Sequence, residues 1–391
     1  MQKNSGTTGT MGVSLATILG LNAVIGAGIF GVPAALQTLA GPAGIISYLF
    51  VIVAVLCIAL AMARMSMKFP SESIFYTHTK LWAGHSGGII ATFSYVIGLT
   101  VALGLLGKIA GSYLSLYLPF LSPTPWGVIL IAGLTALCFT GAKGTHVSQI
   151  ILIIFTILPL VLITALCSSK ADFNNLIPFA PHGAWGAFSA IKAVVFGFFG
   201  FEAIPSLFSS IKNPQRTIPR AIILTVLITG IVYLSFTTAM LLALPTALFE
   251  NSSTPLSKAL LVIFPTYKWL VIGIDLSIII TIAGTLHSML LAVSSIFSAT
   301  IKKITIHSPF SSIRNSLILI AFGAICCTFI FNDINTLFSL VALGITAAFA
   351  GSIVPLLLDK SESFFYRFIA LAGLGGTALI AICGLVGIFV S

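Results

Sequence analysis

Glycines interrupt the first long apolar segment of this chain, which runs roughly from Met11 to Leu36. Gly26, Gly28 and Gly31 lie near its middle, where a helix that crosses a lipid bilayer would be expected to continue. Backbone N–H and C=O groups freed at that depth must bond to protein, water or a ligand. We therefore expect a discontinuous helix whose break lines a cavity rather than a lipid-facing surface.

A second interruption lies about halfway along the chain, in Phe196-Gly197-Phe198-Phe199-Gly200-Phe201-Glu202. Paired interruptions in corresponding segments of two halves are typical of transporters built from repeats, whose substrates bind between the broken helices. The two breaks together predict a transport site near the middle of the bilayer.

The composition is that of a membrane protein. Of the 391 residues, 58% are hydrophobic and only 7% are charged, and the mean hydropathy is +1.15. So few charges cannot cover a water-soluble surface of this size. We expect an integral membrane protein in contact with the lipid bilayer, without a soluble domain.

Apolar runs of about 20 residues predict eleven transmembrane helices in an all-α protein. Their expected limits are 11–37, 43–63, 86–113, 126–141, 148–167, 187–210, 219–243, 269–299, 315–331, 335–358 and 367–390. With a cytoplasmic N-terminus, most of the 18 Lys and Arg residues fall in connections on the cytoplasmic side. Short loops rich in Lys and Arg stay in the cytoplasm. We therefore expect a multi-pass protein of the bacterial inner membrane with its N-terminus cytoplasmic and its C-terminus outside.

The net charge of +10 is then a topology signal, and we expect no nucleic-acid partner. Five spans followed by five spans that start on the opposite side would form a five-plus-five inverted repeat with discontinuous helices 1 and 6. We expect a transporter core over 1–358, with a first repeat over 11–167 and a second over 187–358. Residues 359–391 would add one C-terminal helix.

The two breaks offer complementary backbone groups. The outer half-helix of the first break is expected to begin near Ala27 with free N–H groups and a positive dipole end, which suit a carboxylate. The half-helix before Gly197 would end in carbonyl groups that accept hydrogen bonds from an ammonium group. A site with donors for a carboxylate and acceptors for an ammonium group suits a zwitterionic amino acid. The alternative interpretation of the glycines is close packing between helices. The predicted substrate-binding residues are Ile25, Gly26, Ala27, Gly28, Ile29, Phe196, Gly197, Phe198, Phe199 and Gly200.

Two motifs resemble a known family. Gly26-Ala27-Gly28-Ile29-Phe30-Gly31-Val32-Pro33 is similar to the G-[SA]-G-[IV]-F signature of the amino acid-polyamine-organocation (APC) transporters. Phe198 to Glu202, followed by Lys212-Asn213-Pro214-Gln215-Arg216-Thr217-Ile218-Pro219-Arg220, resembles that family's sixth helix and its K-N-P-x-R-x-[IV]-P loop. The resemblance implies the inverted-repeat fold, substrate bound between helices 1, 3, 6, 8 and 10, and alternating access.

The chain also departs from the family pattern. Family members usually have twelve spans and a Pro-Glu-Ala-Gly-Gly-like sequence after helix 2, where this chain has Pro70-Ser71-Glu72-Ser73. The phrase Phe199-Gly200-Phe201-Glu202-Ala203-Ile204-Pro205-Ser206 is similar to the hydroxy and aromatic amino acid permeases. The amino acid that the chain would carry therefore stays open.

Ionisable groups at bilayer depth are costly and each needs an account. Glu202 lies just beyond the second break, where burial favours exchange of a proton near neutral pH. In several relatives of the resembled family, a carboxylate at this position is implicated in proton coupling. The alternative is a permanently protonated glutamate that bonds the unwound backbone. His287 either faces the cavity as a proton relay or packs against a neighbouring helix.

Other polar groups leave further alternatives open. We expect Lys108 to reach the outer interface, Asp275 to lie in an outer vestibule, and a pairing between them to be possible. By resemblance to sodium-driven relatives, Ala23 or Val24 of helix 1 could face Thr285 and Ser288 of helix 8. No cofactor is expected, and the coupling ion is expected to be H⁺ rather than Na⁺.

The sequence thus predicts a secondary active transporter of neutral, apolar or aromatic amino acids. The alternatives are an amino acid exchanger or a sodium symporter on the same fold, or a non-transporting sensor or channel. Gly84-His85-Ser86-Gly87-Gly88 matches the G-x-S-x-G pattern of serine hydrolases, but that pattern needs a strand-turn-helix setting, so we do not expect an enzyme. The oligomeric state is left open.

Overall fold

Helices make up nearly all of the described part of the computed structural model, which comprises residues 11–26, 28–71, 73–139, 146–206, 211–249, 255–304 and 308–389. Seven of these helices are long and apolar enough to cross a membrane. They are α3 (Gly44–Lys68), α4 (Ile74–Tyr117), α9 (Pro214–Ala243), α11 (Lys268–Ile304), α12 (Ile313–Ile330), α13 (Ile334–Leu358) and α14 (Phe364–Phe389).

The bent pair α1 (Val13–Val24) and α2 (Gly28–Leu39) passes the same test together, with an angle of 49° between the two helices. Shorter apolar helices follow at α5 (Pro123–Phe139), α6 (His146–Ser168) and α7 (Gly183–Phe196), and α8 (Ala203–Ser206) and α10 (Leu256–Ile263) are shorter still. The 3-10 turns are η1 (Gly41–Ala43), η2 (Phe173–Leu176), η4 (Thr246–Leu248), η5 (Pro265–Tyr267) and η6 (Pro309–Ser311).

This helical architecture confirms the expected all-α fold, and each expected span overlaps a helix. The number of membrane crossings and the inverted repeat stay predictions. The range of α4 joins two helices across a kink at Gly84, so the start expected near residue 86 lies two residues after this kink and a further helical segment from Ile74 precedes it. Gly84 bends the helix there with φ 68° and ψ −168°, a backbone conformation that glycine adopts without a steric cost.

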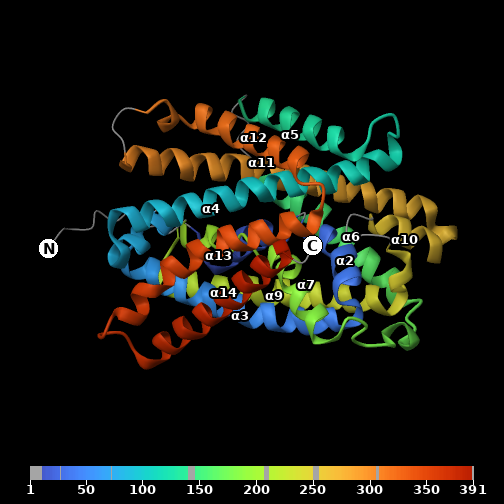
Figure 1. Cartoon of the computed structure of the whole chain (residues 1–391), viewed down its shortest axis with the longest axis horizontal. Coiled ribbons are helices and arrows are strands. Elements are labelled where there is room, and N and C mark those ends of the chain that lie inside the picture. The colour runs from blue at the N-terminus through green and yellow to red at the C-terminus, as the bar shows by residue number, and fades with distance from the viewer. Residues whose placement is uncertain are drawn as a thin grey trace.

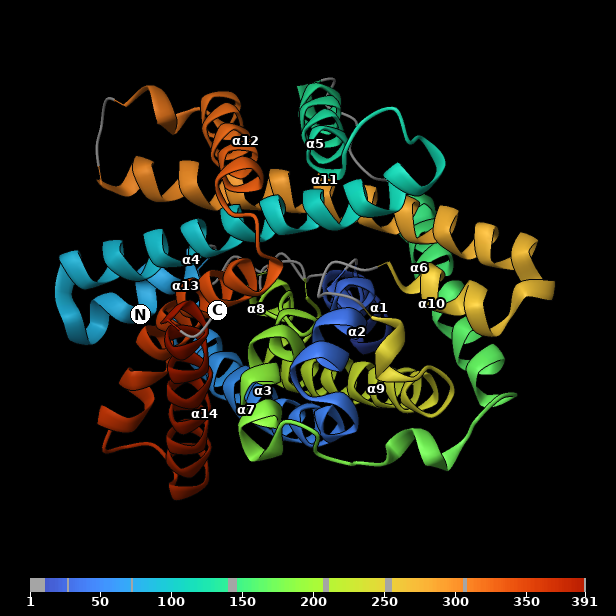
Figure 2. The ribbon, with the colours of Figure 1, turned by 45° about the vertical axis from the view of Figure 1, so that its right-hand side comes forward.

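The helices form two layers (Figure 1). We call α4, α5, α11 and α12, which pack on one another, the scaffold, and α1, α2, α3, α7, α8 and α9, which likewise contact each other, the bundle. Figure 2 shows α4 and α11 crossing the molecule as long rods between the outlying α5 and α12 and the bundle. α13 packs between α4 and α14, and α6 links α9 to α11.

Small residues allow the long helices to approach closely. A Cβ atom on Gly98 of α4 would come within 3.1 Å of the Gly344 backbone in α13, and the Ser94 hydroxyl donates to the Gly344 carbonyl at 2.8 Å. In a membrane, where burial from lipid gives little driving force, such close packing and interhelical hydrogen bonds hold helices together. The contact fixes α13 along α4.

An ion-pair network joins the end of α3 to the α13–α14 connection. Glu362 pairs with Arg64 at 3.1 Å and with Lys68 at 2.6 Å, and Lys68 also contacts Asp359 at 2.6 Å. Burial alone would raise the pKa of Glu362, but the hydrogen bonds from Lys68 and Arg64 lower it. The pKa of Asp359 is likewise held below its usual range by the Lys68 ammonium. The network fixes the bundle to the C-terminal helix pair at this end of the molecule.

Candidate functional site

The two helix breaks contact each other through backbone. Gly200 has φ 121°, and a Cβ atom there would overlap the Ala23 carbonyl. A Cβ on Gly28 would lie 3.3 Å from the Gly197 Cα atom and 3.3 Å from the Phe196 ring. The position of Gly200 requires a residue without a side chain, which glycine alone provides, whereas a side chain at position 28 would need its neighbours to shift by a few tenths of an ångström. The glycines thus bring the two breaks together as well as leaving backbone uncovered.

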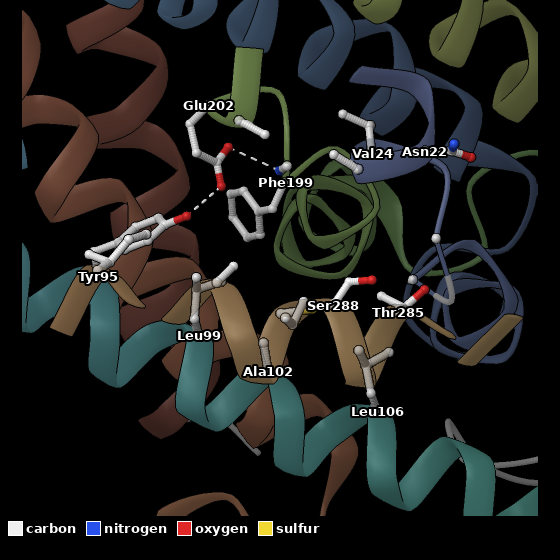
Figure 3. Close-up of a pocket in the computed structure, with 18 of the residues that line it drawn as sticks. Asn22, Val24, Tyr95, Leu99, Ala102, Leu106, Phe199, Glu202, Thr285 and Ser288 are labelled. Atoms are coloured by element: carbon white, nitrogen blue, oxygen red, sulfur yellow. Dashed lines mark hydrogen bonds between the residues drawn. The ribbon is translucent and has the colours of Figure 1, made fainter. Parts of the chain in front are cut away.

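A cavity of about 670 Å³ opens where the breaks meet the scaffold (Figure 3). Its walls come from both breaks, from α4 and α11, and from Thr156 of α6. The lining on the scaffold side combines apolar and hydroxyl-bearing side chains, namely Thr92, Tyr95, Leu99, Ala102 and Leu106 of α4 and Thr281, Gly284, Thr285, Ser288, Met289, Ala292, Ser295 and Ile296 of α11. A volume of this size is ordinary for a small-molecule site.

Most of the predicted site residues lie on this cavity. The lining includes Ala23, Val24, Ile25, Gly26, Gly28, Phe196, Phe199, Gly200, Glu202, Thr285 and Ser288. Phe198 is not among the lining residues, because its ring packs against Tyr48 and Tyr233 inside the bundle. Ile29 and Gly197 are also absent from the lining, and Ile29 is fully buried. Ala27 lies outside the described residues.

His287 lies on α11 but does not line the cavity. Its Nε2 atom is buried without a hydrogen-bond partner. The residue itself is partly exposed, and both alternatives for this histidine stay predictions. Its predicted role in proton coupling gains no support from this position.

The backbone groups of the breaks differ in detail from the expected arrangement. α2 begins at Gly28, and the first N–H groups of a helix have no intrahelical acceptor. At the end of α7, the Val194 and Val195 carbonyls accept 3-10-type hydrogen bonds from the N–H groups of Gly197 and Phe198, at 3.1 and 3.0 Å. These last carbonyls of α7 are therefore bonded within the chain, which differs from the free carbonyl groups expected there.

Glu202 lies at one side of the cavity with two hydrogen-bond donors (Figure 3). The Tyr95 hydroxyl donates to Oε1 at 2.6 Å, and the Gly200 N–H donates to Oε2 at 3.0 Å. The side chain is 6% exposed. Sequence reasoning missed Tyr95, although its spacing to Leu99 and Ala102 places all three on one face of α4. The carboxyl group is held at the turn that ends the second break.

Hydroxyl-bearing and small residues form a stripe along α11. Thr281, Thr285, Ser288, Ala292 and Ser295 are spaced by four and three residues in alternation, which places them on one helix face. Ser288, Ala292 and Ser295 are exposed, and the lining continues to Ser73 at the start of α4. The cavity therefore opens toward the Ser73 end of the molecule. The spacing was the signal for this stripe, and sequence reasoning used only two of its members.

Two of the residues predicted for a sodium site, Val24 and Thr285, take part in hydrogen bonds within the chain. Gly26 faces Thr285, since a Cβ there would lie 2.8 Å from the threonine hydroxyl. The Val24 carbonyl accepts from the Tyr233 hydroxyl at 3.1 Å, and the Thr285 hydroxyl donates to the Thr281 carbonyl at 2.9 Å. A cation bound by the Val24 carbonyl would have to share that oxygen with the Tyr233 hydroxyl.

Lys108 and Asp275 do not pair with each other. The Lys108 ammonium donates to the Asn332 carbonyl in the α12–α13 connection at 3.4 Å, and its side chain is buried rather than exposed. Asp275 accepts instead from the Tyr117 hydroxyl at 2.6 Å. Each group thus has its own partner near the outlying end of α4.

The hydrolase-like pattern lies on a helix. Ser86 is exposed on α4, two residues after the bend at Gly84, and it is not part of the cavity. The Nδ1 atom of His85 hydrogen-bonds with the Tyr76 hydroxyl at 2.8 Å. Since the pattern requires a strand-turn-helix context, this setting does not supply a nucleophile elbow.

Comparison with known proteins identifies the family. The model of the amino acid permease family matches residues 11–391. The chain belongs to the amino acid permease family. This membership confirms the resemblance to the APC transporters that the glycine motifs indicated. The family and the names of its relatives point to a transporter rather than to a hydrolase.

Relatives of this permease-family chain are named as transporters. It is 26% identical over 293 residues to an uncharacterised transporter of Mycobacterium tuberculosis, covering 73% of this chain and 64% of that one. It is 26% identical over 264 residues to the branched-chain amino acid permease BcaP of Bacillus subtilis, covering 62% and 57%. The chain thus matches less than two thirds of the length of these relatives. A solved Na⁺-coupled sialic acid symporter shares the fold, with a TM-score of 0.57, 17% identity, and coverage of 98% of this chain and 90% of that one.

Proposed function

We propose that this chain is a secondary active transporter that carries an amino acid across the bacterial inner membrane by alternating access. The observation that carries the proposal is the cavity enclosed by both helix breaks in a chain of the amino acid permease family. The first N–H groups of α2 suit the substrate carboxylate. The carbonyls of the turn after α7 suit its ammonium group.

The proposed substrate is a neutral, apolar or aromatic amino acid. Glu202 is the one carboxylate among the described lining residues, and that lining includes no Lys, Arg or His. A substrate with a charged side chain would therefore lack a partner beyond Glu202. Leu99, Ala102 and Leu106 provide an apolar wall on α4 opposite the breaks. A branched-chain substrate, as in the name of the Bacillus relative, is consistent with this wall.

The proposed coupling ion is H⁺, taken up by Glu202. Its buried carboxyl group lies on the cavity and is held by Tyr95 and Gly200, so a proton can enter from the same space as the substrate. In the Na⁺ alternative, the ion would have to share the Val24 carbonyl with the Tyr233 hydroxyl. Obligate exchange would use the same substrate site without a net ion movement.

The structure corresponds to one state of the proposed cycle. With the predicted topology, the open Ser73 end is cytoplasmic, so the state faces inward. At the opposite end, the ring centroids of Phe196 and Phe338 are 5.3 Å apart, so the two rings are in contact. A Cβ atom on Gly31 would overlap the Ile109 side chain, so little free space remains at this end. Transport then requires the bundle to move against the scaffold and separate these contacts.

The test is uptake of labelled amino acids into proteoliposomes under separate inward H⁺ and Na⁺ gradients. The wild-type protein should accumulate a neutral amino acid only with the H⁺ gradient. Glu202→Gln should lose this accumulation, because the amide cannot take up a proton, but should keep exchange of labelled for unlabelled substrate. Accumulation that follows Na⁺, or that needs internal amino acid, would contradict proton coupling, and absence of any amino acid transport would contradict the function itself.

A further inference from the structure

A second buried carboxyl group lies far from the transport cavity. Asp275 is 1% exposed on α11, ten residues before Thr285, which is about 15 Å along a helix. It does not line the cavity. Its position is near the beginning of α11, at the end of the molecule opposite Ser73, beside the short helix α10 (Figure 2). The predicted topology places this end outside.

The hydrogen bonding of Asp275 is incomplete. The Tyr117 hydroxyl donates to its Oδ2 atom at 2.6 Å. The Oδ1 atom is buried without a well-formed hydrogen bond, although the Ser257 hydroxyl of α10 is close enough to act on the carboxyl group. The Ser257 hydroxyl is itself buried at 1% exposure and equally unsatisfied. Even where the Ser257 hydroxyl turns to donate its hydrogen to Oδ1, the donors that the described residues bring to this carboxyl group are neutral hydroxyl groups and not cations.

Charged groups around Asp275 do not compensate a carboxylate. The titratable side chains of α4 near Asp275 are the tyrosines Tyr113 and Tyr117. Lys258 of α10 and Lys268 of α11 are exposed, and every ion pair in the described part of the chain involves Arg64 or Lys68. Residues 28–39, 123–139 and 154–168, from α2, α5 and α6, include no acidic or basic side chain. Arg314 begins α12, at the opposite end of the molecule.

We propose that Asp275 is a second proton-binding site, and that its protonation closes α10 over the outer end of the transport path. α10 contacts α11 and α2, and the Leu256 N–H donates to the Tyr113 hydroxyl at 3.3 Å. With α10 docked, an ionised Asp275 is a buried charge without a cationic partner, which is costly. With α10 lifted, water reaches the carboxyl group and stabilises its charge. Docking therefore takes up one proton.

The sign of the effect follows from this linkage. Because the docked form holds the additional proton, docking is favoured at low outside pH and weakens as the pH rises. The proton comes from the outside and returns there when α10 lifts. Asp275 would thus gate the outer end without moving charge across the membrane, in contrast to Glu202. Na⁺ is a poorer occupant, because it would need more oxygen ligands than this single carboxylate and its hydroxyl neighbours offer.

The test measures opening of α10 by labelling with a membrane-impermeant maleimide from the outside. Ala259→Cys places the probe on the buried face of α10, and Val262→Cys places a matched probe on its exposed face. Both labelling rates are read on the α10 peptide by mass spectrometry. Dividing the rate of Ala259→Cys by the rate of Val262→Cys removes the pH dependence of the thiol reaction itself. In the wild-type background this ratio should rise between pH 5 and 8, by up to about tenfold per pH unit for one coupled proton.

Variants separate this site from others. Asp275→Asn should abolish the pH dependence of the ratio, whereas Asp172→Asn, at an exposed acid outside α10 and α11, and Glu202→Gln should both retain it. A ratio that changes less than about twofold over this range in the wild-type background would overturn the proposal. So would pH dependence that persists in Asp275→Asn, or a ratio that responds to Na⁺ at constant pH. The labelling needs no transport, so its failure is distinct from failure of the proposed function.

Discussion

Glu202 and Tyr95 are 107 positions apart in the sequence and share a hydrogen bond in the structure. The tyrosine belongs to the scaffold and the glutamate to the bundle, so the bond crosses the boundary between the two layers. When Glu202 takes up a proton, Tyr95 bonds to a neutral acid instead of a carboxylate. Because hydrogen bonds to charged groups are stronger, protonation weakens this bond. The pair therefore connects the protonation of one residue to the contact between layers.

Replacing Tyr95 by phenylalanine should weaken proton-driven accumulation without abolishing substrate binding. A hydrogen bond to a charged group is worth about 1.5–3 kcal/mol, so we expect a loss of about tenfold or more in the accumulation rate. Substrate exchange should be affected less. Uptake into proteoliposomes with and without a pH gradient measures both.

Tyr76→Phe is the matched control, because it removes a tyrosine hydroxyl from the same helix, bonded to His85 outside the cavity. It should leave both activities near the wild-type level. Equal losses in the two variants would mean that the Tyr95 effect is structural rather than specific to Glu202.

At the scale of elements, the ion-pair network of Arg64, Lys68, Asp359 and Glu362 couples α3 to the α13–α14 connection. The side chain of Glu362 is 2% exposed, whereas the side chains of Lys68 and Asp359 are 25% and 34% exposed. The exposed part of the network is screened by solvent and contributes little to stability. Most of the attachment therefore depends on Glu362.

Glu362→Gln should loosen the α13–α14 connection. Loss of the pairs should speed amide hydrogen exchange of residues 359–367 about fivefold at pH 7, which corresponds to about 1 kcal/mol. Because the pKa of Glu362 is lowered in the folded protein, its contribution is present above the unfolded pKa and is lost as the pH falls through the folded pKa. Acidification below about pH 4.5 should thus bring the wild-type exchange toward that of the variant.

Asp333→Asn provides the control for this measurement. Asp333 caps the other end of α13, where asparagine also caps well, so exchange over 359–367 should not change. Wild-type exchange that stays constant on acidification, after correction for intrinsic rates, would show that the network does not hold this connection.

For the whole molecule, the two layers meet along α4 and α11 (Figure 2). The lining of the cavity shows that it opens at one end of this contact. The stripe on α11 supplies exposed polar positions from the breaks toward the Ser73 end. At the other end, buried aromatic and aliphatic side chains close the path. If the predicted topology holds, the open end is cytoplasmic, and this makes a direct prediction about access to side chains.

Ser295→Cys should react with a polar thiol reagent applied from the cytoplasmic side, and Ser294→Cys should not. Ser295 is exposed on the cavity, whereas its neighbour Ser294 is fully buried and donates to the Leu290 carbonyl. We expect the labelling rates to differ at least about tenfold in inside-out vesicles, since burial limits reaction to rare opening. Faster labelling of Ser295→Cys in right-side-out vesicles would show that the predicted topology is wrong.

The sequence was sufficient for properties that depend on composition and local backbone chemistry. Hydropathy over about 20 residues identifies helices that can cross a bilayer. Gly26, Gly28 and Gly200 mark the breaks because a helix that loses its hydrogen bonds in a membrane needs another source of partners. The family motifs lie at the same breaks, and family comparison confirmed them. Most of the predicted lining follows, because those residues are close to the breaks along the chain itself.

Contacts between distant helices were decided only by the tertiary structure. Tyr95 as the partner of Glu202, Phe198 inside the bundle and the separate partners of Lys108 and Asp275 all depend on how one helix is rotated against another. In a chain that is 58% hydrophobic, apolar residues surround each helix, so the apolar pattern alone does not show which face meets protein and which meets lipid. The sequence by itself determined where the helices break, and the packing of α4 and α11 against the bundle decided which side chains meet there.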